Sequence, residues 1–397
     1  MLTQSQLPQP DSNAQQLSQQ LIANIKSQIQ QQGGQLPFSA FMQAALYEPG
    51  LGYYSNSLRK FGAAGDFITA PEVSPLFSQC LAQQCQQIFA AIADKSAIIL
   101  EFGAGSGIMA AELLKELANL NALPEQYWIL ELSAELRQRQ RETLQTHIPT
   151  YLDRVQWLDH LPEQPFQGVI LANEVLDAMP VEKFRIKAAG EFERACVSWQ
   201  ENQGFHWQWQ TMPENLATQL QHGLSDVLSS LPEGYESEWN PALAHWLQSV
   251  AEILQHGLIL LIDYGFPRHE YYHPQRDQGT LYCHYRHHSH GDPFLYPGLQ
   301  DITAHVDFTA VAEAALDAGL DVCAYSNQAD FLLACGLPER FALSDPDDVE
   351  NHARLSKHIQ TLTLPSEMGE LFKVIALGKE IDIALQGFPR EQRYRLG

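Results

Sequence analysis

A glycine-rich segment, Glu-Phe-Gly-Ala-Gly-Ser-Gly at residues 101–107, is the first feature of the sequence that indicates chemistry. It follows an apolar run at 97–100 and precedes a helical pattern at 108–120, the strand–loop–helix position where doubly wound sheets bind their ligands. Glycines there permit positive φ angles and a close approach of the backbone to a ligand. We therefore predict a cofactor loop that contains Gly103, Ala104, Gly105 and Gly107.

The residues around this loop indicate which cofactor it binds. The third glycine of the dinucleotide pattern GxGxxG would fall at Ile108, and the Lys-Ser/Thr pair of a P-loop is missing. Glu101 directly precedes the loop, and its charge is unfavourable beside a pyrophosphate but favourable beside the ammonium and sulfonium of S-adenosylmethionine (SAM). We therefore predict a SAM site and disfavour a nicotinamide-dependent oxidoreductase. The alternative is a glycine turn that only packs a helix against a strand.

Two further strand ends supply candidate cofactor contacts. Glu131 follows the predicted strand 127–130, where an acid can accept hydrogen bonds from both hydroxyls of a ribose. Its alternative role is an exposed carboxylate that the dipole of the following helix stabilises. The next predicted strand, 155–158, ends in Trp157 and Leu158, which we expect either to cover the adenine or to belong to the core.

The candidates for catalysis follow the fourth predicted strand, 168–171. Glu174 and Asp177 lie three positions apart, so on a helical turn they would share a face at the carboxyl edge of the sheet. Paired carboxylates match the fork of a guanidinium and can accept its proton as a methyl group is transferred. Asn173 adjoins them. The alternative is that Asn173 and Glu174 cap backbone groups and that Asp177 caps a helix.

The elements that must position these residues alternate between strands and helices. Such an order favours a parallel sheet with helices on both faces. The remaining pattern predicts helices at 14–31, 74–93, 134–144, 242–255 and 308–318, a hairpin of strands 192–199 and 205–209, and strands at 258–262, 322–325 and 371–377.

We expect three regions along the chain: a Gln-rich arm and helix at 1–35, a cap region at 36–95, and an α/β domain at 96–397. Two insertions interrupt this domain, at about 181–240 and at 265–303. The second insertion lacks periodicity, and its length and aromatic content favour a lid. Cys283, His284, His287, His288 and His290 within it fit no standard zinc spacing, so we predict no metal site.

Composition excludes several classes of protein. The chain of 397 residues is 45% hydrophobic and 18% charged, which is typical of a globular protein with a large core. Its net charge of −23 repels a phosphate backbone, so we expect no nucleic acid partner; the charge suits a basic protein or a guanidinium, or serves solubility alone. Without a long apolar run or a leader pattern, we expect a cytoplasmic protein with no membrane span. The six cysteines form no CxxC pair and are predicted to be buried thiols.

A series of short motifs, in order through most of the chain, resembles the MidA family of SAM-dependent methyltransferases. That family includes the mitochondrial arginine methyltransferase that assists assembly of respiratory complex I. The family's cofactor loop usually reads Gly-Pro-Gly-Arg-Gly, and this chain keeps the three glycines at 103–107 but not the arginine. The matching stretches are 47–54, 65–72, 101–107, 131–140, 173–180, 234–238, 263–265, 301–308 and 368–370.

This resemblance implies a class I methyltransferase-like doubly wound sheet. The sheet would be mostly parallel with an antiparallel last strand, with a helical N-terminal segment and the inserted hairpin and lid. The resemblance places Glu101, the loop glycines and Glu131 on SAM, with Asp66 closing over the cofactor. It places Asn173, Glu174 and Asp177 near the reacting centre. It also implies that four residues face the substrate cleft: Arg286, His287, His305 and Asp307. Of these, His305 is a further catalytic candidate.

The resemblance also implies an activity, protein-arginine N-methylation. The substrate would then be a protein such as a subunit of respiratory complex I or its bacterial counterpart. A protein of a different class, a SAM-binding assembly factor with little catalysis, stays open as the alternative. The sequence predicts neither the methylation state of the product nor the oligomeric state.

Overall fold

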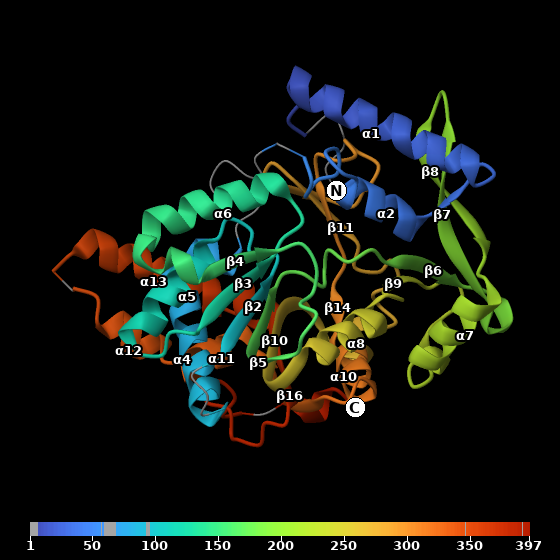
Figure 1. Cartoon of the computed structure of the whole chain (residues 1–397). Coiled ribbons are helices and arrows are strands. Elements are labelled where there is room, and N and C mark those ends of the chain that lie inside the picture. Colours follow the sequence, from blue (N-terminus) through green and yellow to red (C-terminus); the bar gives the residue numbers. More distant parts are fainter. Residues whose placement is uncertain (1–6, 57, 59–68, 93–95, 346, 391) are drawn as a thin grey trace. The chain divides into compact units, whose positions relative to one another are not determined.

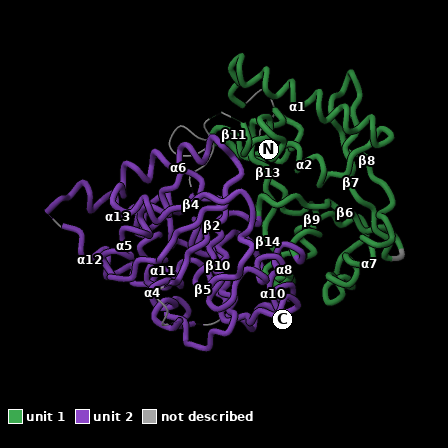
Figure 2. The backbone as a smooth tube through the Cα atoms, viewed as in Figure 1, with its two compact units in different colours: residues 1–67, 177–243, 267–310 green, residues 68–176, 244–266, 311–397 purple. Residues whose placement is uncertain are grey.

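The computed structural model describes residues 7–56, 58, 69–92, 96–345, 347–390 and 392–397 (Figure 1). The chain divides into two compact units, which Figure 2 colours separately. Unit 1 comprises residues 1–67, 177–243 and 267–310, and unit 2 comprises residues 68–176, 244–266 and 311–397. Each unit is thus assembled from segments that are distant in the sequence.

Unit 2 contains the predicted doubly wound sheet. Its strands are β2 (Ile98–Phe102), β3 (Gln126–Leu130), β4 (Val155–Leu158), β5 (Phe166–Asn173), β10 (Leu254–Phe266), β15 (Asp321–Asn327) and β16 (Phe372–Lys379). They are arranged in the order β15-β16-β10-β5-β2-β3-β4. The pairs from β10 to β4 are all parallel, whereas β16 runs antiparallel to both of its neighbours. The mostly parallel sheet with an antiparallel last strand is therefore confirmed.

Helices cover both faces of this sheet. Ile99 of β2 belongs to the large apolar cluster that helices α4 and α5 share, while Phe102 packs on Trp246 of α8 with ring centroids 5.3 Å apart. Such alternation along a strand places successive side chains on opposite faces. The helices are α3 (Ala70–Val73), α4 (Pro75–Ile92), α5 (Ile108–Asn119), α6 (Ala134–His147), α8 (Leu243–Ile253), α10 (Phe308–Asp317), α11 (Gln328–Ala334), α12 (Leu337–Ala342), α13 (Val349–Thr363) and α14 (Met368–Leu371).

Unit 1 has an antiparallel sheet and a separate apolar core. The predicted hairpin is present as β7 paired with β8, and the sheet continues in the order β1-β7-β6-β9. Phe38 and Phe41 are fully buried in the core, together with apolar residues of the first helix. The elements are α1 (Ser12–Gln31), β1 (Leu36–Pro37), α2 (Phe38–Tyr47), β6 (Glu182–Ile186), β7 (Phe192–Gln200), β8 (Gly204–Thr211), α7 (Glu214–Gly223) and β9 (Glu236–Trp239).

The segment 265–303 is more ordered than its lack of periodicity indicates. It forms a short helix and a small antiparallel sheet of order β12-β11-β13. Strands of two to four residues are too short to show an alternating pattern, so the sequence could not reveal them. The elements are α9 (Arg268–Tyr271), β11 (Tyr282–Tyr285), β12 (His288–His290), β13 (Asp301–Thr303) and, just beyond, β14 (Val306–Asp307).

The cysteines and the helices bear on two further expectations. All six cysteines are free thiols and five of them are buried, which confirms the prediction. Burial raises the pKa of Cys85 to about 12. Among the helices of the described ranges, none has both the length and the apolar character needed to cross a bilayer.

Candidate cofactor and active site

The glycine loop joins β2 to α5 in the conformation that its sequence predicts. Gly103, Gly105 and Gly107 have φ angles of 62°, 52° and 84°, a region that residues with a Cβ rarely adopt. The amide of Gly107 donates to the carbonyl of Ala104 at 2.7 Å, which closes the turn. The loop therefore presents backbone rather than side chains at the start of α5.

Glu101 is a buried carboxylate of β2, two residues before the first glycine of this loop. It is 1% exposed, and the hydroxyl of Tyr127 on the neighbouring strand donates to its Oε2 at 2.7 Å. Burial raises the pKa of Glu101 to about 7, although the Tyr127 hydrogen bond lowers it and the charge of Glu131 raises it again. A cation bound beside Glu101 would offset the cost of burying its ionised form.

Glu131 is likewise buried, at 8% exposed, and so is not the exposed carboxylate of the alternative interpretation. Its Oε1 accepts a hydrogen bond from the backbone N–H of Ser133 at 2.9 Å. Burial raises the pKa of Glu131, while the hydrogen bonds from Ser133 and Gln140 and the charge of Arg137 oppose the rise. Hydroxyl donors of a ribose would favour the ionised carboxylate here.

Trp157 and Leu158 end β4 in half-buried positions. The indole N–H of Trp157 donates to Gln140 Oε1 at 2.8 Å, and the guanidinium carbon of Arg141 lies 4.8 Å from the centre of a Trp157 ring. The backbone carbonyl of Leu158 accepts from Arg137 Nη2 at 2.6 Å. Trp157 also packs against the apolar core, and a contact of either side chain with adenine stays a prediction.

The segment after β5 is a turn, so the expectation that Glu174 and Asp177 share a helical face is wrong. Glu174 has a φ of 53°, and Asp263 within β10 accepts from the backbone N–H groups of Val175 (3.2 Å) and Leu176 (2.9 Å). These bonds hold the chain in a bend that a helix would not allow. They also show that Asp263 caps these backbone groups.

Asn173 and Glu174 face each other at this edge of the sheet. Asn173 Nδ2 donates to Glu174 Oε1 at 3.1 Å. Asn173 Oδ1 is buried and has no hydrogen-bond partner within the described residues. A buried acceptor without a donor is costly, and a ligand that brings an N–H or O–H group would remove this cost.

Asp177 and His305 belong to unit 1, where they lie on adjacent segments. Asp177 is 5% exposed, and its backbone carbonyl accepts from the N–H of Ala304 at 3.0 Å. The Tyr54 hydroxyl donates to Asp301 at 2.9 Å, and its pKa is raised well above the usual value by burial and then by the charges of Asp301 and Asp177, among others.

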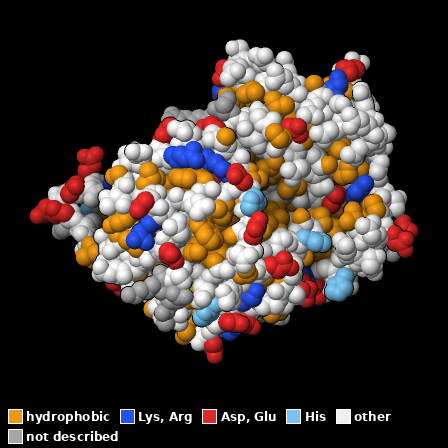
Figure 3. Space-filling view, in the orientation of Figure 1, with side chains coloured by type: hydrophobic (Ala, Val, Ile, Leu, Met, Phe, Trp, Pro, Cys, Tyr) orange, Lys and Arg blue, Asp and Glu red, His pale blue; other side chains and the backbone are white. Residues whose placement is uncertain are grey.

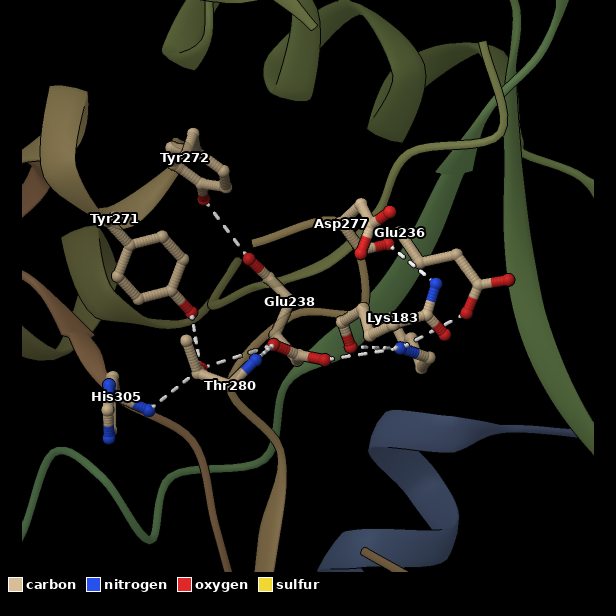
Figure 4. Close-up of polar contacts among 9 residues, drawn as sticks. Lys183, Glu236, Glu238, Tyr271, Tyr272, Asp277, Thr280 and His305 are labelled. Atoms are coloured by element: carbon tan, nitrogen blue, oxygen red, sulfur yellow. Dashed lines mark hydrogen bonds and ion pairs between the residues drawn. The ribbon is translucent and has the colours of Figure 1, made fainter. Parts of the chain in front are cut away.

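A buried ion pair in unit 1 supports the backbone of His305 (Figure 4). Glu238 is fully buried; its Oε1 lies 3.3 Å from Lys183 Nζ, and its Oε2 accepts from the backbone N–H of Thr280 at 2.6 Å. The hydroxyl oxygen of Thr280 then accepts from the backbone N–H of His305 at 3.1 Å. The network ties 280–305 to strands β6 and β9.

The other residues expected to face a substrate have contacts of their own. Arg286 and His287 have φ angles of 47° and 62° and form the turn between β11 and β12. Asp307 accepts from the backbone of Thr309 at 3.0 Å and pairs with Arg268 Nε at 3.3 Å, so it caps the start of α10. Their orientation toward a substrate stays a prediction.

The segment around Asp66 lies partly outside the described residues, and Asp66 itself is among those not described. Its continuation, α3, does reach the glycine loop, because Ser106 donates from its hydroxyl to Glu72 Oε1. Sequence reasoning assigned no role to Glu72, Tyr127 or Gln140. The one available signal was a polar residue at an otherwise apolar position of a strand or helix.

Comparison with known proteins extends over both units. A family model described as S-adenosyl-L-methionine-dependent methyltransferase matches residues 80–326. A COG1565 superfamily member from Burkholderia thailandensis, in a crystal structure with S-adenosyl-homocysteine bound, is 45% identical; the match covers 97% of this chain and 98% of that chain, with a TM-score of 0.92.

Two curated relatives are more distant. The mitochondrial protein arginine methyltransferase NDUFAF7 homolog of Drosophila melanogaster is 27% identical over 394 residues, which cover 91% of this chain and 84% of the relative. Protein arginine methyltransferase NDUFAF7 of Danio rerio, also mitochondrial, is 26% identical over 372 residues, which cover 87% of this chain and 83% of the relative.

Proposed function

Because the chain belongs to a family of SAM-dependent methyltransferases, we propose that it transfers the methyl group of SAM to an arginine side chain of a protein. The family model and the S-adenosyl-homocysteine bound to the Burkholderia thailandensis relative identify the cofactor as SAM. This confirms the cofactor predicted from the glycine loop and Glu101. The names of the Drosophila and Danio relatives support arginine as the acceptor.

The residues of unit 2 fit this cofactor. Three glycines with positive φ give the loop no side chains at these positions, and Glu101 offers a buried carboxylate to a cationic ligand. Glu131 offers a second carboxylate, fixed by Ser133 at the end of β3. When bound, SAM supplies a methyl group on a positively charged sulfur, and the chain's own task is to orient the acceptor and take its proton.

The observation that carries the arginine proposal is the pair Asn173–Glu174. A guanidinium has a pKa above 12 and presents N–H donors in a planar fork, so a neighbouring carboxylate orients it and accepts a proton only as the new bond forms. Glu174 supplies such a carboxylate, and the buried Oδ1 of Asn173 supplies an acceptor that lacks a donor within the described residues. The catalytic roles that the sequence predicts for Asp177 and His305 stay predictions.

The charge of the chain also supports a basic protein as the substrate. The net charge is −23, and Figure 3 shows many of the acidic side chains spread over the face in view. Basic side chains gather over α6, which carries Arg137, Arg139 and Arg141. An acidic surface attracts a basic polypeptide and repels nucleic acid. We extend the proposal, from the MidA resemblance, to a subunit of respiratory complex I as substrate.

The test is transfer of a labelled methyl group from SAM into a lysate of cells that lack this protein. We expect one dominant labelled band, with mass spectrometry placing the label on arginine. Glu174→Gln and Asp177→Asn should each lower the initial rate by roughly 10²–10⁴-fold, typical for loss of a positioned base, with little change in affinity for S-adenosyl-homocysteine.

Other outcomes of this experiment would distinguish arginine methylation from methylation of another residue and from a role as an assembly factor. Wild-type rates in both variants would show that these carboxylates are structural. A label on another residue type would refute arginine as the acceptor while leaving methyl transfer intact. A chain that binds SAM and labels no protein would support the assembly factor instead.

A further inference from the structure

Gln140 contacts three parts of the cofactor site at once. It lies on α6 and is fully buried. Its Nε2 donates to the backbone carbonyl of Gly105 at 3.1 Å and to Glu131 Oε2 at 3.1 Å, and its Oε1 accepts from Trp157 Nε1 at 2.8 Å. A single amide therefore joins the glycine loop, the carboxylate after β3 and the tryptophan at the end of β4.

The chemistry of these partners fixes which way the amide points. A carboxylate and a backbone carbonyl only accept hydrogen bonds, and an indole N–H only donates. Only one orientation of the Gln140 amide satisfies all three, and turning it by 180° would set acceptor against acceptor and donor against donor. No other proteinogenic side chain of this length offers two donors and an acceptor in that geometry.

The consequence for Glu131 is that both of its oxygens are held. Oε2 is held by Gln140, and Oε1 is held by the backbone N–H of Ser133 at 2.9 Å. The same amide is bound to Gly105, whose φ of 52° lets the loop backbone bend. Close packing keeps α6 in place, because a Cβ on Gly107 would lie 3.1 Å from the Cα of Gln140.

We propose that Gln140 is a positioning residue for SAM, which holds the Glu131 carboxylate and the Gly105 peptide in a fixed relation before the cofactor binds. These two groups then need no ordering when the cofactor binds, so the entropy cost of ordering them does not reduce the affinity. The proposal rests on the assignment of Glu131 to the ribose, which the ligand series below tests separately.

The test compares Gln140→Met with the wild-type chain by calorimetry, using S-adenosyl-homocysteine and its 2′-deoxyribose analogue. Methionine keeps the length and volume of the side chain and removes its hydrogen bonds. We expect the variant to bind S-adenosyl-homocysteine about 10–100-fold more weakly, in line with losing bonds to a charged group. For the deoxy analogue, which already lacks one hydroxyl for Glu131, the loss should shrink to about threefold.

One control and one second test variant keep the result interpretable. Gln138→Met changes an exposed glutamine of the same helix, which bonds to Glu142, and should leave both affinities unchanged. Trp157→Phe removes the N–H that fixes the amide without touching Glu131, and should weaken S-adenosyl-homocysteine by about threefold to tenfold. If Gln140→Met does not fold, Trp157→Phe with the same two ligands provides the test.

Unchanged affinity in both Gln140→Met and Trp157→Phe would overturn the proposal. An equal loss for the two ligands would also overturn it, because packing would then be the cause rather than the orientation of Glu131. If the wild-type chain bound the deoxy analogue as tightly as S-adenosyl-homocysteine, the ribose assignment itself would be refuted. None of these results bears on arginine as the methyl acceptor.

Discussion

Replacing Glu101 by glutamine should stabilise the ligand-free protein and weaken its binding of SAM. The pKa of Glu101 stands at about 7 against an ordinary value of 4.5, so ionising it in the folded chain costs about 3 kcal/mol more than in the unfolded chain. Because the pKa is raised on folding, the contribution of the protonated Glu101 to the free energy of unfolding is fully present below about pH 4.5. It is lost as the pH rises through about 7. Glu101→Gln resembles the protonated acid and still accepts from Tyr127.

Two measurements follow from this substitution. Without ligand, Glu101→Gln should match the wild-type free energy of unfolding near pH 4.5 and exceed it near pH 8, by up to about 3 kcal/mol. The affinity of the wild-type chain for SAM should rise about tenfold for each unit by which the pH increases toward 7, because the cationic cofactor favours the ionised carboxylate. The affinity of the variant should be lower near pH 7.5 and nearly independent of pH.

Calorimetry of SAM binding between pH 5.5 and 7.5 tests this reasoning, and Glu131→Gln is the control. Glu131 is buried as well, and that variant should bind more weakly but keep the pH dependence that Glu101 causes. A wild-type affinity that does not change over this range would refute the assignment of Glu101. So would a pH dependence that persists in Glu101→Gln and disappears in Glu131→Gln.

Substitutions at Gly105, Glu131 and Gly279, the last with Gly190 as its control, have definite expected results. Gly105→Val, at a φ of 52°, should leave a folded chain that no longer binds S-adenosyl-homocysteine; near-normal affinity by calorimetry would contradict the loop assignment. Glu131→Ala should weaken SAM by about 1–3 kcal/mol and Glu131→Gln by less, since one acceptor remains; equal losses would argue against a ribose contact. Gly279→Ala should lower the unfolding free energy by about 3 kcal/mol or more, because its Cβ would press on buried Glu238. Gly190→Ala, with a similar φ but open space, should cost only about 1 kcal/mol in the same denaturant titration.

The parts of the fold that the sequence predicts best are those with a long period or a steric requirement. Helix α5 begins at Ile108 and strand β4 spans Val155–Leu158, as expected from the apolar pattern. The loop between β2 and α5 was predictable because only glycine adopts its φ angles without strain. In each case the cause lies within a few residues of its effect.

The interactions that orient the site were not predictable, because their partners are distant in the sequence. Asp263 holds the turn at Val175 and Leu176 across 88 and 87 positions, and nothing local to 174–177 signals that bend. Gln140 reads as an ordinary polar residue of an amphipathic helix until the fold brings Glu131 and Trp157 to it. Pattern identifies which residue types a site has, and tertiary contacts determine their geometry.

The buried acids of the chain differ in what balances their charge, and this difference separates structure from function. Glu238 is fully buried, but Lys183 lies 3.3 Å away and the backbone of Thr280 donates to it, so the protein itself stabilises the carboxylate. Glu101 is buried to the same degree with a neutral tyrosine as its donor, and no cation of the described residues forms an ion pair with it. A buried acid with a raised pKa and no counter-charge is typical of a binding site, because the missing charge arrives with the ligand. If SAM binds beside Glu101, its positive charge would supply that balance, and the burial that destabilises the free protein would then strengthen cofactor binding.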